Sequence, residues 1–291
     1  VLAFGQQSPT VLTCHDLSQF HPEYDDPSYF SRRGLASRIF LRMLARGIRR
    51  ADRIVTVSAF VRDELIRSGL GNEAKIDVVP NGVDLNAYRP RPKEECAAVL
   101  AHYGLPGNRR LVLYVGTDHP RKNLAGLFRA FARFRVKDSL LVSVGIPREP
   151  QHSRLVAAAE SLGITSRIVF VRDVAEADLP LLYSASDVLV LPSFYEGFGL
   201  PPLEAMACGI PVAVARAAGL PEVVGDAAYL VDPDDSSKMM TTLVKGITED
   251  VTRVEVRVYD PLAYAANSNV APLAVAEANP ANGTFMISGI V

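Results

Sequence analysis

The sequence predicts an α/β fold, in which short buried strands alternate with helices around parallel sheets. Short runs rich in β-branched residues alternate with longer segments whose apolar residues recur at helical spacing, a pattern typical of α/β layering. The chain has 291 residues, of which 48% are hydrophobic. A chain of this length and composition can bury a sizeable core in one large or two medium domains.

The strands and helices can be placed along the chain by these patterns. The segments expected to be strands are 10–14, 53–58, 75–80, 110–116, 140–145, 167–171, 187–193 and 211–215. Helical spacing is clearest in 123–134, 153–163 and 178–186. Strands that alternate with helices in this way favour parallel sheets, because each parallel connection needs a crossover segment.

Composition divides the chain into three parts. Segment 80–95 is rich in proline, asparagine, glycine and charge, and is interpreted as a linker. We therefore expect a partial N-terminal domain at 1–82, a second α/β domain at 83–250 and a β-patterned tail at 251–291. The tail is set apart by period-two alternation in 251–259, which predicts antiparallel strands and the start of another domain. Because the chain begins in an apolar run without methionine, we also expect an upstream part to be missing.

Charge and cysteine content exclude several classes of protein. Lysine and arginine total 31 against 32 aspartate and glutamate, so no global basicity suggests nucleic acid as a partner. Cys14, Cys96 and Cys208 lie far apart, which suits reduced packing residues in a cytoplasmic protein. No apolar run approaches the roughly 18–20 residues of a membrane span, and the first residues lack a basic leader.

The most informative stretch is "SFYEGFGLPPLEAMACG", residues 193–209. A buried strand leads into a glycine loop and then a short helix with two prolines in its first turn. Backbone N–H groups and the positive dipole end of such a helix favour an anion such as a diphosphate. Gly197 and Gly199 are expected to let the backbone approach that anion closely.

Two glutamates flank this loop, and their carboxylates could hold hydroxyl groups. Glu204 is expected in the first turn of the helix, where it could accept hydrogen bonds from a vicinal diol such as that of ribose. Glu196 would lie on the other side of the anion and hold hydroxyls of an attached group. The alternative is that one glutamate merely begins a helix and the other caps a turn.

The segment "EGFGLPPLE" resembles the E-x7-E motif of retaining glycosyltransferases of group 1, family 4, which have the GT-B fold. The resemblance covers about residues 10–247. It implies two Rossmann-like domains with parallel sheets, of which the N-terminal one is incomplete here. The short β-rich tail at 251–291 departs from the family. The helices that usually cross back to the first domain are replaced by that tail.

Other segments resemble the same family in the same order. "YVGTDHPRKNLAGLFRAF" (114–131) is similar to the first strand, loop and helix of its donor domain. The resemblance implies that Arg121 and Lys122 contact the donor phosphates, although alone they could be two solvated basic residues. The implied donor-binding residues are Gly116, Arg121, Lys122, Glu196, Gly197, Phe198, Gly199, Leu200 and Glu204.

"VLTCHDLSQFHPE" (11–23) is similar to the family's "HD" segment at the end of an acceptor-domain strand. The resemblance places His15 at the reaction centre, where it would hydrogen bond to the donor sugar, although a lone histidine is more often structural. The implied catalytic residues are His15, Arg121, Lys122 and Glu196. Ser58 and Asn81 are expected to be structural, and Glu222 to cap a helix.

No metal or other cofactor is expected. Asp232, Asp234 and Asp235 look superficially like a D-x-D site for Mg²⁺ or Mn²⁺, but aspartate and serine before a helical run are typical of an N-cap. The five histidines form no ligand-spaced pair.

A basic amphipathic helix is expected at 37–53. Its arginines, expected along one stripe, are Arg38, Arg42, Arg46, Arg49 and Arg53; its apolar residues, expected on another, are Phe40, Leu41, Leu44 and Ile48. Such a helix can lie on an anionic bilayer, which would make the protein peripheral on the cytoplasmic membrane face, or it can be a solvated face over a core.

The function implied by the resemblance is transfer of a hexose, with mannose as the first candidate, from a GDP- or UDP-sugar. The acceptor would be a hydroxyl of a saccharide or lipid-linked saccharide, as in polysaccharide biosynthesis. A front-face retaining mechanism is implied, in which the leaving phosphate helps deprotonate the acceptor. Two alternatives stay open: an inactive nucleotide-sugar-binding fragment or fusion, and a sugar-nucleotide epimerase of GT-B architecture.

Overall fold

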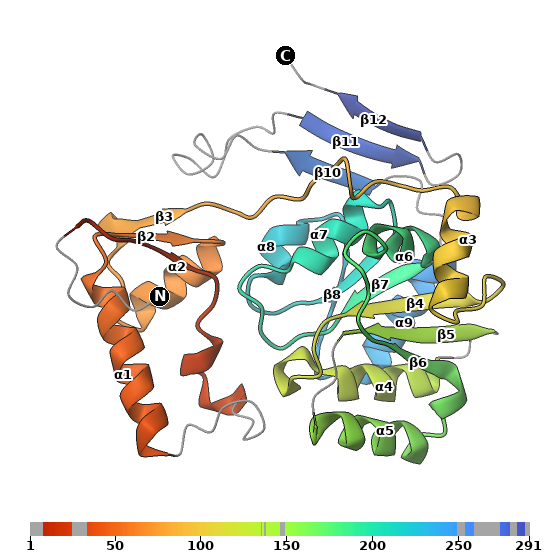
Figure 1. Cartoon of the computed structure of the whole chain (residues 1–291), viewed down its shortest axis with the longest axis horizontal. Coiled ribbons are helices and arrows are strands. Elements are labelled where there is room, and N and C mark those ends of the chain that lie inside the picture. Colours follow the sequence, from red (N-terminus) through yellow and green to blue (C-terminus); the bar gives the residue numbers. More distant parts are fainter. Residues whose placement is uncertain are drawn as a thin grey trace.

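The computed structural model describes residues 8–24, 34–134, 136, 138–145 and 149–248, and three strands at 254–258, 274–279 and 284–288. Figure 1 shows two lobes joined by a linker that runs from β3 to α3, with a third small sheet beside the second lobe. We call residues 8–78 the N-terminal lobe and residues 93–248 the C-terminal lobe.

The N-terminal lobe contains a parallel three-stranded sheet in the order β1-β2-β3. The strands are β1 (Val11–Cys14), β2 (Arg53–Thr56) and β3 (Ile76–Val78), and the helices are α1 (Leu35–Arg50) and α2 (Ala59–Arg67). Three short 3₁₀ turns are η1 (Ser18–Phe20), η2 (Pro22–Tyr24) and η3 (Glu73–Lys75). Ile48, Val61 and Leu65 bury the inner faces of the helices against the sheet.

Six parallel strands form the sheet of the C-terminal lobe, in the order β6-β5-β4-β7-β8-β9. Their bounds are β4 (Arg110–Val115), β5 (Ser139–Val144), β6 (Ile168–Val171), β7 (Val188–Leu191), β8 (Val212–Ala215) and β9 (Tyr229–Val231). The helices are α3 (Lys93–His102), α4 (Leu124–Arg133), α5 (Gln151–Ser161), α6 (Leu179–Ala185), α7 (Leu200–Ala207), α8 (Leu220–Val224) and α9 (Ser236–Thr248), with 3₁₀ turns η4 (Pro120–Lys122) and η5 (Thr165–Arg167).

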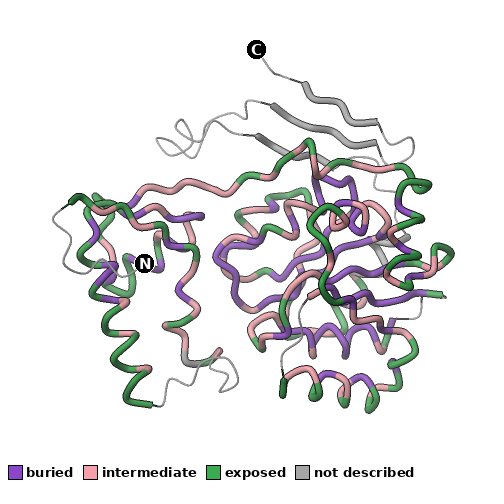
Figure 2. The backbone as a smooth tube through the Cα atoms, in the orientation of Figure 1, coloured by how far each residue is buried: buried purple, intermediate pink, exposed green. Residues whose placement is uncertain are grey.

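Helices cover both faces of this sheet, which explains why its strands are continuous apolar runs. Helices α4, α5 and α9 lie on one side, and α3, α6, α7 and α8 lie on the other (Figure 1). Every residue of β5, β7 and β8 is buried, as the strands of the C-terminal lobe in Figure 2 show. Parallel sheets covered in this way lose the alternation of apolar and polar residues that half-exposed strands have.

The tail forms the antiparallel strands that its sequence predicts. They are β10 (Val254–Val258), β11 (Ala274–Asn279) and β12 (Thr284–Ser288), in the order β10-β11-β12. Strand β10 falls within the alternating segment 251–259, and β12 within the segment 283–291, which follows a turn cluster of proline, asparagine and glycine; no strand is predicted at β11. The remaining residues of the tail lie outside the described part of the chain.

One sequence expectation about the basic helix is wrong. Arg53 does not continue the arginine stripe, because α1 ends at Arg50 and Arg53 begins β2. There its guanidinium pairs with the carboxylate of Asp77 on β3, with Nε 3.0 Å from Oδ2. The three cysteines are free and buried, as their spacing predicts.

Candidate active site

The strand order creates a topological switch point in the middle of the C-terminal sheet, between β4 and β7. Strand β4 pairs with β5 on one side and with β7 on the other, so the chain leaves β4 and β7 in opposite directions around the sheet. Ligands of open α/β sheets bind at such a switch point, beyond the carboxyl ends of the strands. The loops that leave here are 116–123, after β4, and 192–199, after β7.

The loop after β4 is held in shape by its own side chains and by Asn123. The His119 side chain caps η4 by accepting from the backbone N–H of Arg121, at 3.2 Å. Asn123, in the left-handed region at φ 56°, donates through Nδ2 to the carbonyls of Pro192 (3.1 Å) and Pro233 (2.8 Å). These bonds fix Arg121 and Lys122 against the loop that follows β7.

Arg121, Lys122 and Glu196 form one ion cluster beside the switch point. Arg121 Nη1 lies 3.0 Å from Glu196 Oε2, and Lys122 Nζ lies 2.5 Å from Oε1. The Ser193 hydroxyl also donates to Oε1, at 2.8 Å. The three charged side chains are only 18%, 13% and 10% exposed. Because two cations face one carboxylate, the cluster carries excess positive charge and favours the approach of a further anion.

The glycine loop follows directly, and Gly197 contacts the other lobe. A Cβ at residue 197 would stand 1.9 Å from the backbone oxygen of His15, so only glycine fits. The Ser58 hydroxyl donates to the Gly197 carbonyl at 2.6 Å, and Phe198 packs against the N-terminal core. The close approach expected of Gly197 towards an anion is therefore, in this structure, an approach to the N-terminal lobe.

Helix α7 begins after Gly199, whose φ of 112° suits glycine, and its first residue Leu200 is 41% exposed. The two prolines at 201 and 202 carry no N–H, so anion binding at this helix end would depend on the amides of Gly199 and Leu200. The start of α7 therefore offers fewer backbone N–H donors for an anion than expected from the sequence.

Glu204 is not in the first turn of α7, contrary to the sequence expectation. It is the fifth residue of the helix, and its Oε2 accepts a hydrogen bond from the Tyr183 hydroxyl on α6, at 2.7 Å. Burial raises the pKa of Glu204, and hydrogen bonds from Tyr183 and Tyr88 oppose that rise. Burial and the neighbouring Glu204 raise the pKa of Tyr88 to about 12. Glu204 therefore accepts its hydrogen bonds from neutral phenols.

His15 lies where the sequence predicts, directly after β1, with an exposed side chain. Its carbonyl oxygen faces Gly197, so the structure brings the "HD" segment and the glycine loop together. Gly116 directly follows β4, and its N–H donates to the Val144 carbonyl on β5 at 2.9 Å.

A buried polar network between the lobes was missed by the sequence analysis. The Tyr195 hydroxyl accepts from the Leu17 N–H at 2.9 Å and donates to Glu64 Oε2 on α2. His21 contacts the other oxygen of Glu64. Partial burial lowers the pKa of His21, but hydrogen bonds to Glu23 and Glu64 outweigh it, so this pKa lies above its ordinary value.

One sequence signal could have identified this network. Val61, Glu64 and Leu65 all lie on the buried face of α2, and a glutamate at such a position needs a partner.

Other assignments made from the sequence can be placed as well. Glu222 caps a helix, as expected, but the helix belongs to the other lobe: its carboxylate accepts from the N–H groups of Ala59 (2.8 Å) and Phe60 (3.1 Å) at the start of α2. Asp235 accepts from the N–H groups of Ser237 and Lys238, both at 3.0 Å, and thus caps α9. Within the described residues, no group of three or more potential ligands has the arrangement of a metal site.

Helix α1 presents arginines and apolar side chains on the same exposed face. Leu35 is 73% exposed, Ile39 46% and Met43 37%. They alternate with Arg38, Arg42, Arg46, Arg49 and Arg50, all exposed. The expected separation into a basic and an apolar stripe is therefore incomplete: Leu44 and Ile48 pack into the core, but Phe40, which was expected beside them, is 38% exposed.

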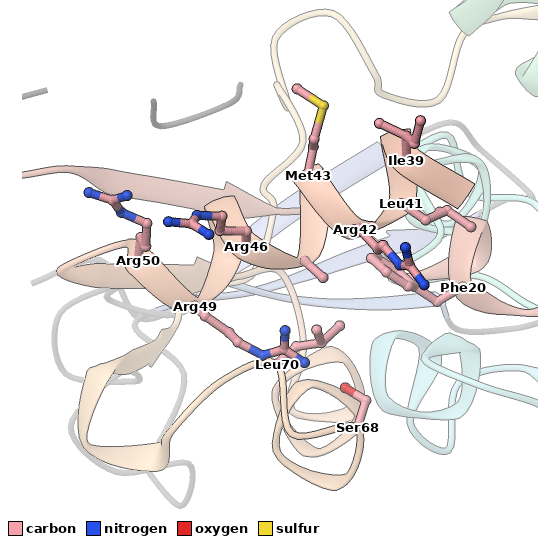
Figure 3. Close-up of a pocket in the computed structure, with 11 residues that line it drawn as sticks. Phe20, Ile39, Leu41, Arg42, Met43, Arg46, Arg49, Arg50, Ser68 and Leu70 are labelled. Carbon is pink, nitrogen blue, oxygen red and sulfur yellow. The ribbon is translucent and has the colours of Figure 1, made fainter. Parts of the chain in front are cut away.

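A groove of about 980 Å³ runs along this helix, with Phe20 and Leu70 among its lining residues (Figure 3). No helix in the described part of the chain is both long and apolar enough to cross a membrane.

Two family models match the chain. Residues 99–256 match the model described as "Glycosyl transferases group 1", and residues 1–87 match "Glycosyltransferase Family 4". The chain is 36% identical over 248 residues to O-antigen chain mannosyltransferase B of Escherichia coli, across 84% of this chain and 62% of that protein. It is also 36% identical over 166 residues to D-inositol 3-phosphate glycosyltransferase of Rhodococcus opacus, across 55% of this chain and 36% of that one. The chain thus spans less than two thirds of these relatives.

Solved structures confirm the predicted GT-B type of fold. Anabaena HepE in complex with UDP-glucose superposes with a TM-score of 0.69 at 25% identity, over 83% of this chain and 63% of that one. WaaG, a glycosyltransferase involved in lipopolysaccharide biosynthesis, gives a TM-score of 0.69 over 84% of this chain and 68% of that one, but at 20% identity it bears on the fold alone. The matched models cover most of the chain, which therefore belongs to the glycosyl transferases group 1 family.

Proposed function

We propose that this protein transfers a hexose, with retention of configuration, from a nucleoside diphosphate sugar to a hydroxyl acceptor. The observation that carries the proposal is the cluster of Arg121, Lys122 and Glu196 at the switch point. Its excess positive charge suits a donor diphosphate, and the one carboxylate in it suits the hydroxyls of the attached sugar.

In this mechanism, stabilisation of the leaving diphosphate is the main catalytic contribution. As the bond between the sugar and the phosphate breaks, Arg121 and Lys122 would form hydrogen bonds to the phosphate oxygens and weaken their ion pairs with Glu196. Glu196, released in part, would orient the sugar hydroxyls. The departing phosphate would take the acceptor proton on the same face, and His15 would hydrogen bond to the sugar from the N-terminal lobe.

Mannose is the first choice of sugar, because the relative named above is a mannosyltransferase with 36% identity. For the nucleotide, similarity leaves both GDP and UDP as candidates, since HepE is described with UDP-glucose. We propose GDP-mannose as donor. Glu204 would hold the ribose diol, which both nucleotides share.

A panel of GDP-, UDP- and ADP-sugars tests the proposal directly. The expected result is a thermal shift with one sugar nucleotide and, with a saccharide acceptor, a product whose anomeric proton shows retention by NMR. Binding without transfer would support the inactive-fragment alternative, and conversion of the donor sugar without acceptor would support the epimerase. A product of inverted configuration would contradict the mechanism.

We propose further that transfer needs no metal ion. Arg121 and Lys122, which pair with Glu196, would supply two positive charges at the proposed phosphate position, so a divalent ion would not be required to neutralise the leaving group. The expected result is that the transfer rate in excess EDTA stays within twofold of that in Mg²⁺ or Mn²⁺. A rate that falls at least tenfold with EDTA and returns with the metal would refute this proposal.

We also propose that α1 binds an anionic membrane surface and brings the site to a lipid-linked acceptor. Arginines with exposed Leu35, Ile39 and Met43 between them combine electrostatic attraction with apolar insertion. The protein should float with vesicles that contain anionic lipid at low salt, and the double variant Arg42→Glu, Arg46→Glu should not. Arg110→Glu on the other lobe is the matched control. Absence of flotation for the unaltered protein would refute the proposal that α1 binds a membrane surface.

A further inference from the structure

The side chain of Tyr195 crosses from one lobe into the other, directly before Glu196. It is 3% exposed, and its ring lies 5.0 Å from that of His21, 5.7 Å from Tyr24 and 5.7 Å from Phe60, all measured between centroids. These three rings belong to the N-terminal lobe. The backbone of Tyr195, by contrast, belongs to the loop after β7 in the C-terminal lobe.

The hydroxyl of Tyr195 makes two hydrogen bonds in this pocket, and both partners are buried. It accepts from the N–H of Leu17 and donates to the Glu64 carboxylate, which is 7% exposed. Leu17 stands two residues after His15, in the loop that leaves β1. The Tyr195 hydroxyl thus connects the His15 loop to α2 through one oxygen atom.

The backbone of Tyr195 makes the complementary connection within the C-terminal lobe. Its carbonyl accepts from Arg121 Nη1 at 2.8 Å, and the same nitrogen lies 3.0 Å from Glu196. Neighbouring backbone bonds complete the arrangement: Phe194 N–H donates to the Arg121 carbonyl at 2.8 Å, and Gly219 N–H donates to the Glu196 carbonyl at 3.0 Å. A displacement of Tyr195 would therefore move Arg121 and Glu196 together.

We infer that Tyr195 and Glu64 are positioning residues for the transfer reaction. They fix the distance between His15 on one lobe and the Arg121–Glu196 pair on the other, without touching the substrate. This inference rests on the proposed function, because the groups that it positions are those to which donor binding and chemistry are assigned there. A displacement of about 1 Å at a reacting centre can cost on the order of 100-fold in rate, so such a connection has a measurable kinetic effect.

A purely structural role, in which Tyr195 simply holds the lobes together, makes a different prediction. The molecule offers a matched control, because Glu222 also spans the lobes, through its bonds to the start of α2. If Tyr195 only joins the lobes, then Tyr195→Phe and Glu222→Ala should have equal effects. If Tyr195 positions the site, only the first should change the chemical step.

The first measurement is steady-state kinetics with the donor that the nucleotide-sugar panel identifies. Tyr195→Phe and Glu64→Ala are expected to lower kcat about 10- to 100-fold, with the KM for the donor within about twofold. Glu64→Gln, which keeps an acceptor oxygen for the Tyr195 hydroxyl, should recover most of the rate, and Glu222→Ala should stay within about threefold. Equal losses for Tyr195→Phe and Glu222→Ala would overturn the inference.

The second measurement is amide hydrogen exchange, which needs no turnover. In Tyr195→Phe, the amide of Leu17 should exchange at least tenfold faster, and so should the amides of Phe194 and Gly219 in the other lobe. Exchange that changes only at Leu17 would overturn the inference. If the unaltered protein transfers no sugar at all, the proposed function fails, and the exchange result alone then decides whether Tyr195 fixes this geometry.

Discussion

Glu196 and Glu204 belong to one loop and helix, yet the structure gives the two carboxylates opposite surroundings. Glu196 lies between an arginine and a lysine, with a serine hydroxyl as a third donor. Glu204 lies against the phenol of Tyr183, in a buried position that raises its pKa. Residues of the same type in one motif can thus have different surroundings: Glu196 is part of a charge cluster, whereas Glu204 accepts hydrogen bonds from phenols.

The largest expected effect comes from removing both cations around Glu196. The double variant Arg121→Met, Lys122→Met leaves a carboxylate with 10% exposure and no cationic partner from this cluster. We expect it to lower the free energy of unfolding in urea by roughly 3–5 kcal/mol, because an unpaired buried charge keeps its full desolvation cost.

Two further variants control this experiment. Adding Glu196→Gln to the double variant should restore most of the lost stability, since the unpaired charge is then gone. Arg110→Met removes the more exposed pair with Asp187 and should cost no more than about 1 kcal/mol. If the triple variant is as unstable as the double variant, the two cations do not serve to compensate Glu196.

The next largest expected effect is a loss of nucleotide affinity when Glu204 is removed. Glu204→Ala should weaken GDP or UDP binding about 10- to 100-fold by calorimetry, because hydrogen bonds to a charged group contribute about 1.5–3 kcal/mol. Glu196→Ala should mainly lower kcat. Tyr183→Phe, which leaves the carboxylate in place, is the control and should bind nucleotide as the unaltered protein does. Unchanged nucleotide affinity in Glu204→Ala would contradict the assignment to ribose.

The smallest effect is on the pH dependence of stability. The pKa of Glu204 is raised above its ordinary value of 4.5, so the folded state holds the proton more tightly than the unfolded state. Protonated Glu204 therefore adds to the free energy of unfolding. This contribution is fully present below about pH 4.5 and is lost as the pH rises through the raised pKa. Relative to Glu204→Gln, the unaltered protein should therefore lose stability over that interval, by at most about 1.4 kcal/mol per pH unit.

A companion variant sharpens the pH experiment. Tyr183→Phe removes a hydrogen bond that lowers the pKa of Glu204, so the loss of stability should extend to higher pH. Parallel curves for the unaltered protein and Glu204→Gln between pH 4.5 and 7 would show that Glu204 titrates as an exposed glutamate does.

Much of the fold could be predicted from the sequence because the C-terminal lobe is covered on both faces. Burial on both sides makes β4, β5 and β7 continuous apolar runs, and these runs were recognised nearly to the residue: the segment predicted at 110–116, for example, is the strand Arg110–Val115. The short strand β9, of three residues, lacks such a run and was not predicted.

The site was predictable only as separate residues. Arg121, Lys122 and Glu196 could be named from their motifs, but their ion pairs join residues that are 74 and 75 positions apart and depend on the order of β4 and β7 in the sheet. The network of Tyr195, Glu64 and His21 joins the two lobes, and its hydrogen bond from Tyr195 to Glu64 links residues 131 positions apart. Local sequence patterns carry no information on such pairings, whose geometry arises only from tertiary structure.

The contact between Gly197 and the His15 carbonyl has a practical consequence for trapping reaction states. A single added methyl group at residue 197 would stand 1.9 Å from that oxygen, and the obstacle is backbone that no rotamer change can move aside. Alanine at this position would therefore force the lobes apart at this contact, and the hydrogen bonds of Tyr195 to the same lobe would be stretched as well. We expect such a variant to favour a more open arrangement, in which binding of the proposed sugar nucleotide can be measured apart from transfer.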